Sequence, residues 1–348
     1  MPRLPERTDA DGGLTEDSLV AALRAICEPE DGTFAPPRRV ALGIGDDAAA
    51  WQPSRSHLSV ITSDALVDGV HFLSDAMEAG AIGHRAMAAN LSDLAAMGAR
   101  PILATVVLGV TRATTQPWIL EVYREMARLG ARFGLRIVGG DIVRVPAATF
   151  SLTLVGEVAR GRLKRRAGGR PGDVLAVTGP LGASRAGLEL TLRPRAVDAA
   201  MQAAAMRSFA MPEPRVREGR WLAASANVHA MMDCSDGLST DVARLARASG
   251  CGAELTAVPV AEAARVVAAA AGDDGLRYAL DGGEDFELIV AVAPRAFAHL
   301  SRAFAARFGT ALHRIGRLTE AAGVRLVDAA GSHPLEAGGF DHFATSES

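Results

Sequence analysis

Lysine is almost absent from this 348-residue chain: Lys164 is the only lysine among 37 basic residues. The phosphate-binding loop GxxxxGK[ST] needs a lysine after its last glycine, and no such string occurs. The dinucleotide-binding string GxGxxG is absent as well, because GIGDDA at residues 43–48 lacks the third glycine. If the chain binds a nucleoside triphosphate, metal ions and arginine must therefore neutralise its charge.

Cysteine, aromatic residues and long apolar runs are also scarce. Three cysteines without a CxxC string suggest reduced thiols and a cytoplasmic protein. No apolar run reaches the length of a membrane span, and residues 1–13, which we expect to be disordered, do not have the pattern of a signal peptide. The net charge of −3 argues against a broad basic surface for nucleic acid. We expect no membrane and no nucleic-acid partner.

Alternating strand-like and helix-like segments predict an α/β protein, and the length favours two domains. A basic, glycine-rich stretch at residues 161–172 separates the halves, so we predict domains at 14–160 and 161–348. Helices are predicted over 15–26, 81–97, 117–133, 184–192, 197–208, 217–224, 240–248 and 294–308. Strands are predicted over 40–44, 58–62, 102–110, 136–138, 149–158, 174–177, 228–232, 252–255, 286–292 and 311–318.

Aspartates stand beside glycine or serine in five places, mostly where an apolar run ends. The clusters are GIGDD (43–47), TSD (62–64), LSD (91–93), GGD (139–141) and DCSDG (233–237). One such aspartate is usually a turn residue or a helix cap, but several suggest carboxylates that converge on hard cations. Oxygen ligands suit Mg²⁺ better than zinc. Because clustered Mg²⁺ usually accompanies bound phosphates, the pattern predicts phosphoryl transfer from a nucleotide.

Some of these residues have equally simple structural explanations. Asn90 and Asp93 share one face of a predicted helix among alanines, which leaves room for a ligand. The same pattern would also fit a polar helix face exposed to solvent. Asp236 or Ser235 could simply cap the next helix. The arginines of residues 161–172 could form a solvated loop, or one of them could clamp a phosphate.

Taken together, these motifs resemble those of the thiamine-monophosphate kinase family. The strings GIGDDAA, TSDALVDGVHF, NLSDLAAMGARP, GGD, MPEPR, DCSDGLSTD, DGGEDFEL and GFDHF follow the family's order from about residue 14 to 343. The resemblance implies a two-domain α/β (α+β) fold like that of aminoimidazole ribonucleotide synthetase, with an N-terminal sheet that forms the interface of a homodimer. It implies transfer of phosphate from ATP to thiamine monophosphate, which gives thiamine diphosphate.

The resemblance also implies roles for individual residues. Mg²⁺ ligands fall on Asp47, Thr62, Ser63, Asp64, Asp93, Asp141, Asp233 and Asp236. ATP contacts fall on Gly140, Asp141, Arg166 and Ser235, and contacts to thiamine monophosphate fall on His71, Glu284 and Phe340. We expect Asp64, Asp233 and Arg166 to carry a direct in-line transfer without a phosphoenzyme. At position 340 other family members can have tyrosine, so the aromatic ring is kept here and the hydroxyl is lost.

Two alternatives remain open. The first is another ATP-dependent enzyme of the same superfamily that acts on a different acceptor. Chemistry like that of selenophosphate synthetase would need a reactive cysteine with a lysine near the N-terminus, and Cys27 has no lysine near it. The second is a non-catalytic protein that binds nucleotide or thiamine phosphate, which would need fewer acidic residues than this chain has.

Overall fold

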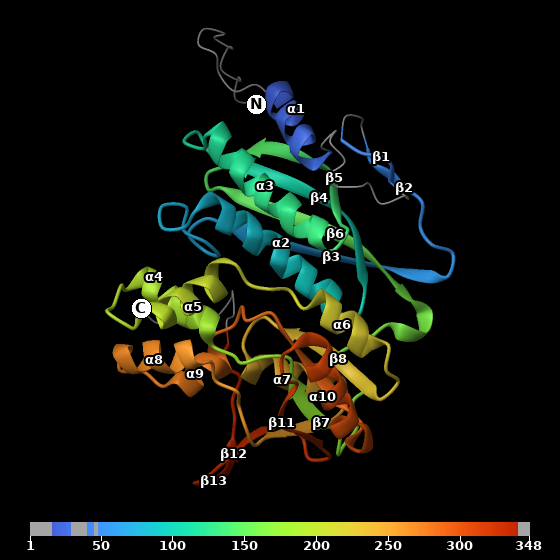
Figure 1. Cartoon of the computed structure of the whole chain (residues 1–348), viewed down its shortest axis with the longest axis vertical. Helices are drawn as coiled ribbons and strands as arrows, with labels where there is room; N and C mark the ends of the chain where they lie inside the picture. The colour runs from blue at the N-terminus through green and yellow to red at the C-terminus, as the bar shows by residue number, and fades with distance from the viewer. Residues whose placement is uncertain (1–15, 29–39, 45–47, 340–348) are drawn as a thin grey trace, which may run out of the picture.

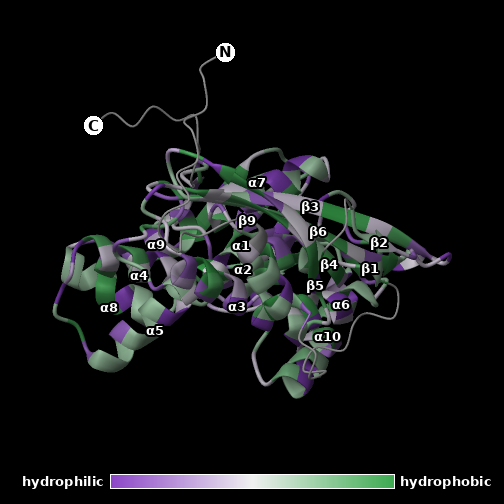
Figure 2. Ribbon diagram, turned by 90° about the horizontal axis from the view of Figure 1, so that it is seen from above, coloured by the Kyte–Doolittle hydropathy of each residue, from purple (hydrophilic) through white to green (hydrophobic). Residues whose placement is uncertain are grey.

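The computed structural model describes residues 16–28, 40–44 and 48–339, and it contains two large β-sheets (Figure 1). The first half forms one sheet and the second half forms the other, with helix α2 (Ala79–Ala96) between them. Figure 2 shows α4, α5, α8 and α9 grouped at one side of the molecule and the first sheet at the other. Among the described residues, no helix combines the length and the apolar character needed to cross a bilayer.

The first half contains a four-stranded sheet in the order β3-β6-β4-β5, so β3 is an edge strand. Burial alternates along β3: even-numbered side chains from Leu58 to Leu66 face α2, while odd-numbered ones such as Ile61 face outward. The elements are α1 (Glu16–Cys27), β1 (Val40–Leu42), β2 (Ala50–Trp51), β3 (His57–Val67), α2, β4 (Arg100–Val110), α3 (Gln116–Arg132), β5 (Arg136–Arg144) and β6 (Thr149–Ala159).

The second half contains a seven-stranded sheet in the order β13-β12-β9-β11-β7-β10-β8. Its elements are η1 (Arg160–Arg162), β7 (Val174–Val177), α4 (Ala183–Leu192), α5 (Ala199–Ala210), α6 (Val216–Ala223), β8 (Val228–Cys234), α7 (Leu238–Ala248), β9 (Gly252–Leu255), α8 (Glu262–Ala271), α9 (Gly275–Asp281), β10 (Glu287–Val292), α10 (Pro294–Phe308), β11 (His313–Thr319), β12 (Val324–Asp328) and β13 (Gly331–Pro334).

Strand β10 is buried on both faces, which explains its unbroken apolar sequence. Leu288, Val290 and Val292 join an apolar cluster shared with the first half, whereas Ile289 and Ala291 join a second cluster under α7. The two halves are therefore packed through one continuous core.

Helix α2 is buried on nearly all sides because it is packed between the two halves. Two glycines permit this packing at backbone distance. A Cβ at Gly83 would lie 2.1 Å from the Val122 carbonyl oxygen of α3, and a Cβ at Gly219 would lie 2.2 Å from the Ala95 carbonyl oxygen of α2. Polar residues of α2 consequently face the protein interior and not bulk water.

The predicted elements agree with most of the observed ones, with several differences. The strand predicted over 58–62 continues to Val67, so Asp64 lies inside an edge strand and not beyond its end. The short strand predicted over 136–138 likewise runs to Arg144. The predictions omitted β2, α8, α9 and the hairpin of β12 and β13, most of which are short segments.

Candidate active site

A cavity of about 1350 Å³ lies between the two halves. Strand β3 and helix α2 line it from the first half, and β8, α4 and the loop before β10 line it from the second. Thr62 and Ser63 point to opposite faces of β3, yet both line the cavity. The cavity therefore wraps around the free edge of this strand.

Three carboxylates line the cavity, and the charge of Asp93 acts on the other two: Asp64 from β3, Asp93 from α2 and Asp233 from β8. Thr62 Oγ1 donates a hydrogen bond of 2.5 Å to Asp93 Oδ2. Ser92 Oγ donates to Asp233 Oδ2 at 2.8 Å, so the hydroxyl links α2 to the end of β8. Each carboxylate comes from a different element, and only the packing of α2 between the sheets brings them together.

The pKa values of these carboxyl groups are raised because the groups lie away from water and close to one another. The pKa of Asp233 rises to about 7, first through burial and then through the charge of Asp93. The pKa of Asp64 rises to about 6, first through burial and then through Asp93 and Asp236. Burial also raises the pKa of Asp93, against the hydrogen bond from Thr62 and the charge of Arg166. The cluster thus needs protons or cations to balance its charge.

Asn90 was predicted to face either a ligand or solvent, and the structure shows it fully buried beside β3. Its Oδ1 accepts a hydrogen bond of 3.1 Å from the backbone N–H of Asp64, and its Nδ2 donates to the Ala86 carbonyl oxygen. Asn90 therefore satisfies a backbone donor on the open edge of β3 and fixes the position of Asp64.

The loop after β8 is held by Asp241, which the sequence analysis did not select. Asp241 Oδ2 accepts hydrogen bonds from the backbone N–H groups of Ser235 and Asp236 at 2.9 and 3.0 Å. Arg244 contacts the carboxylates of both Asp236 and Asp241. No side chain caps the N-terminus of α7, so neither Ser235 nor Asp236 has the capping role considered above, and both lie on the cavity wall.

At the other end of the cavity, Glu284 lies against the buried Arg85 of α2. Arg85 Nη2 is 2.5 Å from Glu284 Oε1, and Arg85 is 2% exposed while the Glu284 side chain is 38% exposed. His71 also lines the cavity, and its Nδ1 accepts a hydrogen bond from the backbone N–H of Val67. Arg85 could have been suspected from the sequence, because a charged residue in so apolar a helix is rarely solvated.

Apolar side chains form the wall beside Glu284. They come from both halves and comprise Val70, Leu73, Met77, Leu188, Leu192 and Phe209. Val70 is 57% exposed and Leu192 is 52% exposed, so the rim of this part of the cavity is apolar too. One end of the cavity thus suits metal-bound phosphate, and the other suits an apolar ring system with a polar group for Glu284 to bind.

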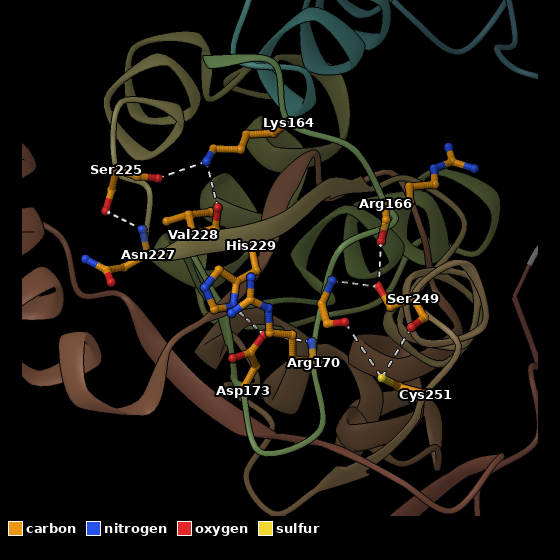
Figure 3. A network of polar contacts seen from close by, with 11 residues as sticks. Lys164, Arg166, Arg170, Asp173, Ser225, Asn227, Val228, His229, Ser249 and Cys251 are labelled. Carbon is orange, nitrogen blue, oxygen red and sulfur yellow. Dashed lines mark hydrogen bonds and ion pairs between the residues drawn. The ribbon is translucent and has the colours of Figure 1, made fainter. Parts of the chain in front are cut away.

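The basic stretch between the halves is irregular and mostly exposed, but several of its groups are bonded to the second half (Figure 3). Lys164 is 8% exposed, and its Nζ donates to the carbonyl oxygens of Ser225 and Val228 at 2.8 and 2.6 Å. Ser249 Oγ donates to the backbone oxygen of Arg166, whose side chain lines the cavity. The only lysine is structural, and Arg166 is the member of this stretch that reaches the cavity.

Most of the predicted site residues line this one cavity. They are Thr62, Ser63, Asp64, His71, Asp93, Arg166, Asp233, Ser235, Asp236 and Glu284. The Ser63 hydroxyl, however, donates to the Leu152 carbonyl oxygen on the outward face of the sheet. Gly140 and Asp141 do not line the cavity; Asp141 lies opposite Val107 on that outward face. Asp47 and Phe340 fall outside the described residues.

The donor set fits a magnesium ion better than a softer metal. Within the described part of the chain, no three His, Cys, Asp or Glu side chains already stand at the spacing of a closed metal site. The converging groups are carboxylates and a threonine hydroxyl, all of them oxygen donors. Burial, and after it the repulsion between the groups, raises the pKa values of Asp64 and Asp233, and a bound divalent cation would relieve that repulsion.

Comparison with known proteins places the chain in a family. The model of the AIR synthase related protein N-terminal domain matches residues 45–158, and that of the C-terminal domain matches residues 170–329. Thiamine-monophosphate kinase of Synechococcus elongatus is 34% identical over 339 residues, which cover 95% of this chain and 97% of the relative.

Two solved structures are similar over most of their length. Thiamine-monophosphate kinase from Stenotrophomonas maltophilia K279a has a TM-score of 0.78 and 34% identity, and the match covers 90% of this chain and 96% of that one. AaThiL complexed with AMPPCP and TMP has a TM-score of 0.73 and 30% identity, with 84% of this chain and 90% of that one covered. The resemblance seen in the motifs is thereby confirmed: the chain belongs to the thiamine-monophosphate kinase family of AIR synthase related proteins.

Proposed function

We propose that the protein transfers the γ-phosphoryl group of ATP to the phosphate of thiamine monophosphate, which yields ADP and thiamine diphosphate. The observation that carries this proposal is one cavity in which a carboxylate cluster adjoins an apolar compartment containing Glu284. The relatives named for this activity, and the AaThiL structure with AMPPCP and TMP, support both substrates.

The chemical difficulty of this reaction is electrostatic. The acceptor is already a phosphate, so it is largely ionised near neutral pH and needs no strong general base. Two unit charges of the same sign about 4 Å apart repel by roughly 4 kcal/mol at an effective dielectric constant of about 20. Asp64, Asp93 and Asp233 would hold Mg²⁺, which supplies charge neutralisation and alignment for phosphoryl transfer.

The protein residues position the groups around that centre. Asn90 fixes the backbone of Asp64, Ser92 fixes Asp233, and Thr62 fixes Asp93. Arg166 lines the same wall and would stabilise negative charge on the transferring group. Because the acceptor phosphate attacks directly, no side chain need carry the phosphoryl group.

The outward face of the first sheet supports a homodimer. Ile61 is 66% exposed, Val107 41% and Val143 39%, and the strand register puts all three on this face. Exposed apolar residues gathered on one face commonly mark an interface. A second copy of the chain would cover them.

The same interface offers a place for Gly140 and Asp141. They lie on β5, at the opposite edge of the sheet from β3, and three strand spacings separate the edges by about 14 Å. Asp141 therefore cannot join Asp64 within one chain. In a dimer stacked on this face, β5 of one subunit could approach the part of the cavity that opens around β3 of the other.

We place the domain division near residues 161–172. Strand β6 of the first sheet ends at Ala159, and β7 of the second sheet begins at Val174. We also propose a cytoplasmic location, since all three cysteines are free and buried, as is usual in a reducing compartment.

The proposed reaction predicts that ADP release depends on thiamine monophosphate. With γ-labelled ATP, label is expected in thiamine diphosphate and none on the protein, because the acceptor attacks the γ-phosphorus directly. Quenched samples separated from small molecules would measure the label on the protein. Thiamine without its phosphate is the control acceptor and should not stimulate turnover. A rate of ADP release that does not depend on thiamine monophosphate would contradict the proposal.

The proposed dimer predicts that Ile61→Asp weakens association by at least about 100-fold, since burying an unpaired carboxylate costs on the order of 3–5 kcal/mol. Sedimentation equilibrium of the wild type and the variant measures the effect. Ala305→Asp, at an exposed position on α10, is the matched control and should leave the association state unchanged. An Ile61→Asp protein that associates like the wild type would refute this interface.

A further inference from the structure

We infer that Arg85 is the positioning residue of the acceptor end of the cavity: it holds Glu284, the His71 segment and helix α5 in the arrangement that receives the second substrate. This inference rests on the proposed function, because it assigns Glu284 and the apolar wall beside it to the phosphorylated acceptor. Arg85 acts on the substrate through these groups.

Arg85 contacts three segments that are far apart in sequence. Its Nη2 donates to Glu284 Oε1 at 2.5 Å and to the His71 carbonyl oxygen at 3.3 Å. Its Nη1 donates to the carbonyl oxygen of Phe209, and its Cζ lies 4.4 Å from the centroid of the Phe209 ring. His71, Phe209 and Glu284 all line the cavity. These partners of Arg85 all belong to the acceptor end.

The geometry of these contacts needs a guanidinium group. Two separate nitrogens reach acceptors from different segments while the flat face covers an aromatic ring. A lysine could replace the charge near Glu284, but its single ammonium nitrogen could not span the same acceptors and stack on the ring. The arrangement therefore joins α2 of the first half to α5 and the Glu284 loop of the second.

Stability alone is a poor explanation for this residue. Arg85 is 2% exposed, and its Nε is buried without a hydrogen-bond partner in the described structure. A buried ion pair with an unsatisfied donor is often no more stabilising than apolar packing of similar volume. A site that must be held in one arrangement gives a reason to retain it.

The backbone of Glu284 shows that its position is enforced. Glu284 has φ of 54°, in the left-handed region that residues with a Cβ rarely adopt. The conformation is held from one side by its N–H, which donates to the Ser235 carbonyl oxygen at 2.6 Å, and from the other by Arg85. Strain of this kind persists only where the surroundings determine it, and it occurs most often at functional sites.

Steady-state kinetics of Arg85→Met and Arg85→Lys, with each substrate varied in turn, test this inference. Arg85→Met should raise KM for thiamine monophosphate by about 10- to 100-fold, the usual effect of losing hydrogen bonds to a charged group. KM for ATP should change by no more than about twofold, because the partners of Arg85 among the described residues belong to the acceptor end. Arg85→Lys should restore part of the loss.

Two further variants make the outcome specific. Arg132→Met removes an exposed 2.6 Å pair with Glu213 that also joins the two halves but does not line the cavity, and its kinetics should match the wild type. Glu284→Gln should raise KM for the acceptor, and the double variant with Arg85→Met should show less than the sum of the two effects.

Each outcome decides a different question. An unchanged acceptor KM in Arg85→Met and Arg85→Lys, or additive effects with Glu284→Gln, would overturn the positioning role. If Arg85→Met does not fold, the comparison of Arg85→Lys with Arg132→Met gives the decision. A wild-type protein that does not use thiamine monophosphate would instead overturn the proposed function, whatever the variants do.

Discussion

Replacing Asp233 by asparagine is expected to lower the rate of phosphoryl transfer on the order of 10³-fold, the scale seen when a preorganised electrostatic group is removed from an active site. Asp233 is 3% exposed near the end of β8, and the charge of Asp93 acts on its carboxyl group. Asparagine has nearly the same shape and can still accept the hydrogen bond from Ser92, but it cannot supply negative charge to a metal ion. Turnover with saturating ATP, thiamine monophosphate and Mg²⁺ measures the loss.

The same variant should remain folded. Asp233 carries a buried charge whose pKa is raised to about 7, so its removal relieves repulsion in the protein without ligands. Circular dichroism and thermal unfolding are the controls, and the melting temperature of Asp233→Asn should equal or exceed that of the wild type. Near-normal turnover in a folded variant would show that this carboxylate does not take part in catalysis.

The raised pKa values also predict how the stability of the ligand-free protein depends on pH. The pKa of Asp233 rises from 3.8 to about 7 and that of Asp64 rises from 3.8 to about 6, both mainly through burial. Over this range the folded protein holds more protons than the unfolded chain, so the free energy of unfolding should fall as pH rises through these values.

The stabilisation by added Mg²⁺ should increase with pH, whereas the stability of the ligand-free protein should decrease. A cation binds the deprotonated carboxylates, so the increase in melting temperature on adding Mg²⁺ should be larger at about pH 8 than at about pH 5. Thermal unfolding with and without Mg²⁺ measures both effects. In Asp233→Asn the two dependences should weaken together. If the wild type and the variant showed parallel profiles, the carboxyl group of Asp233 would not be the titrating group.

Arg85 illustrates which features of the site the sequence could not reveal. Its charge in an apolar helix was visible, but its partners Glu284 and Phe209 lie more than a hundred residues away along the chain. Asp241 was missed for a related reason: it stands inside DCSDGLSTD, yet only the turn of the chain shows that it holds the backbone of Ser235 and Asp236.

Asp141 is a residue that the sequence assigned to the site and that the structure places away from Asp64. The GGD string marked it as a ligand like the other acidic clusters, since sequence spacing does not tell which face or which edge of a sheet a residue occupies. In the structure it lies on β5 and on the outward face, far from Asp64 on β3. A role for Asp141 in the metal site stays a prediction that depends on the second subunit.

From the sequence alone came the two-part α/β organisation, the family, and the chemical nature of the site, because these depend on local periodicity and on short strings of oxygen-bearing residues. Only the tertiary structure decided which of those residues share a cavity, since α2 brings together side chains that the chain separates by more than a hundred positions. Burial by the surrounding core then altered their acidity, and no linear pattern encodes that change.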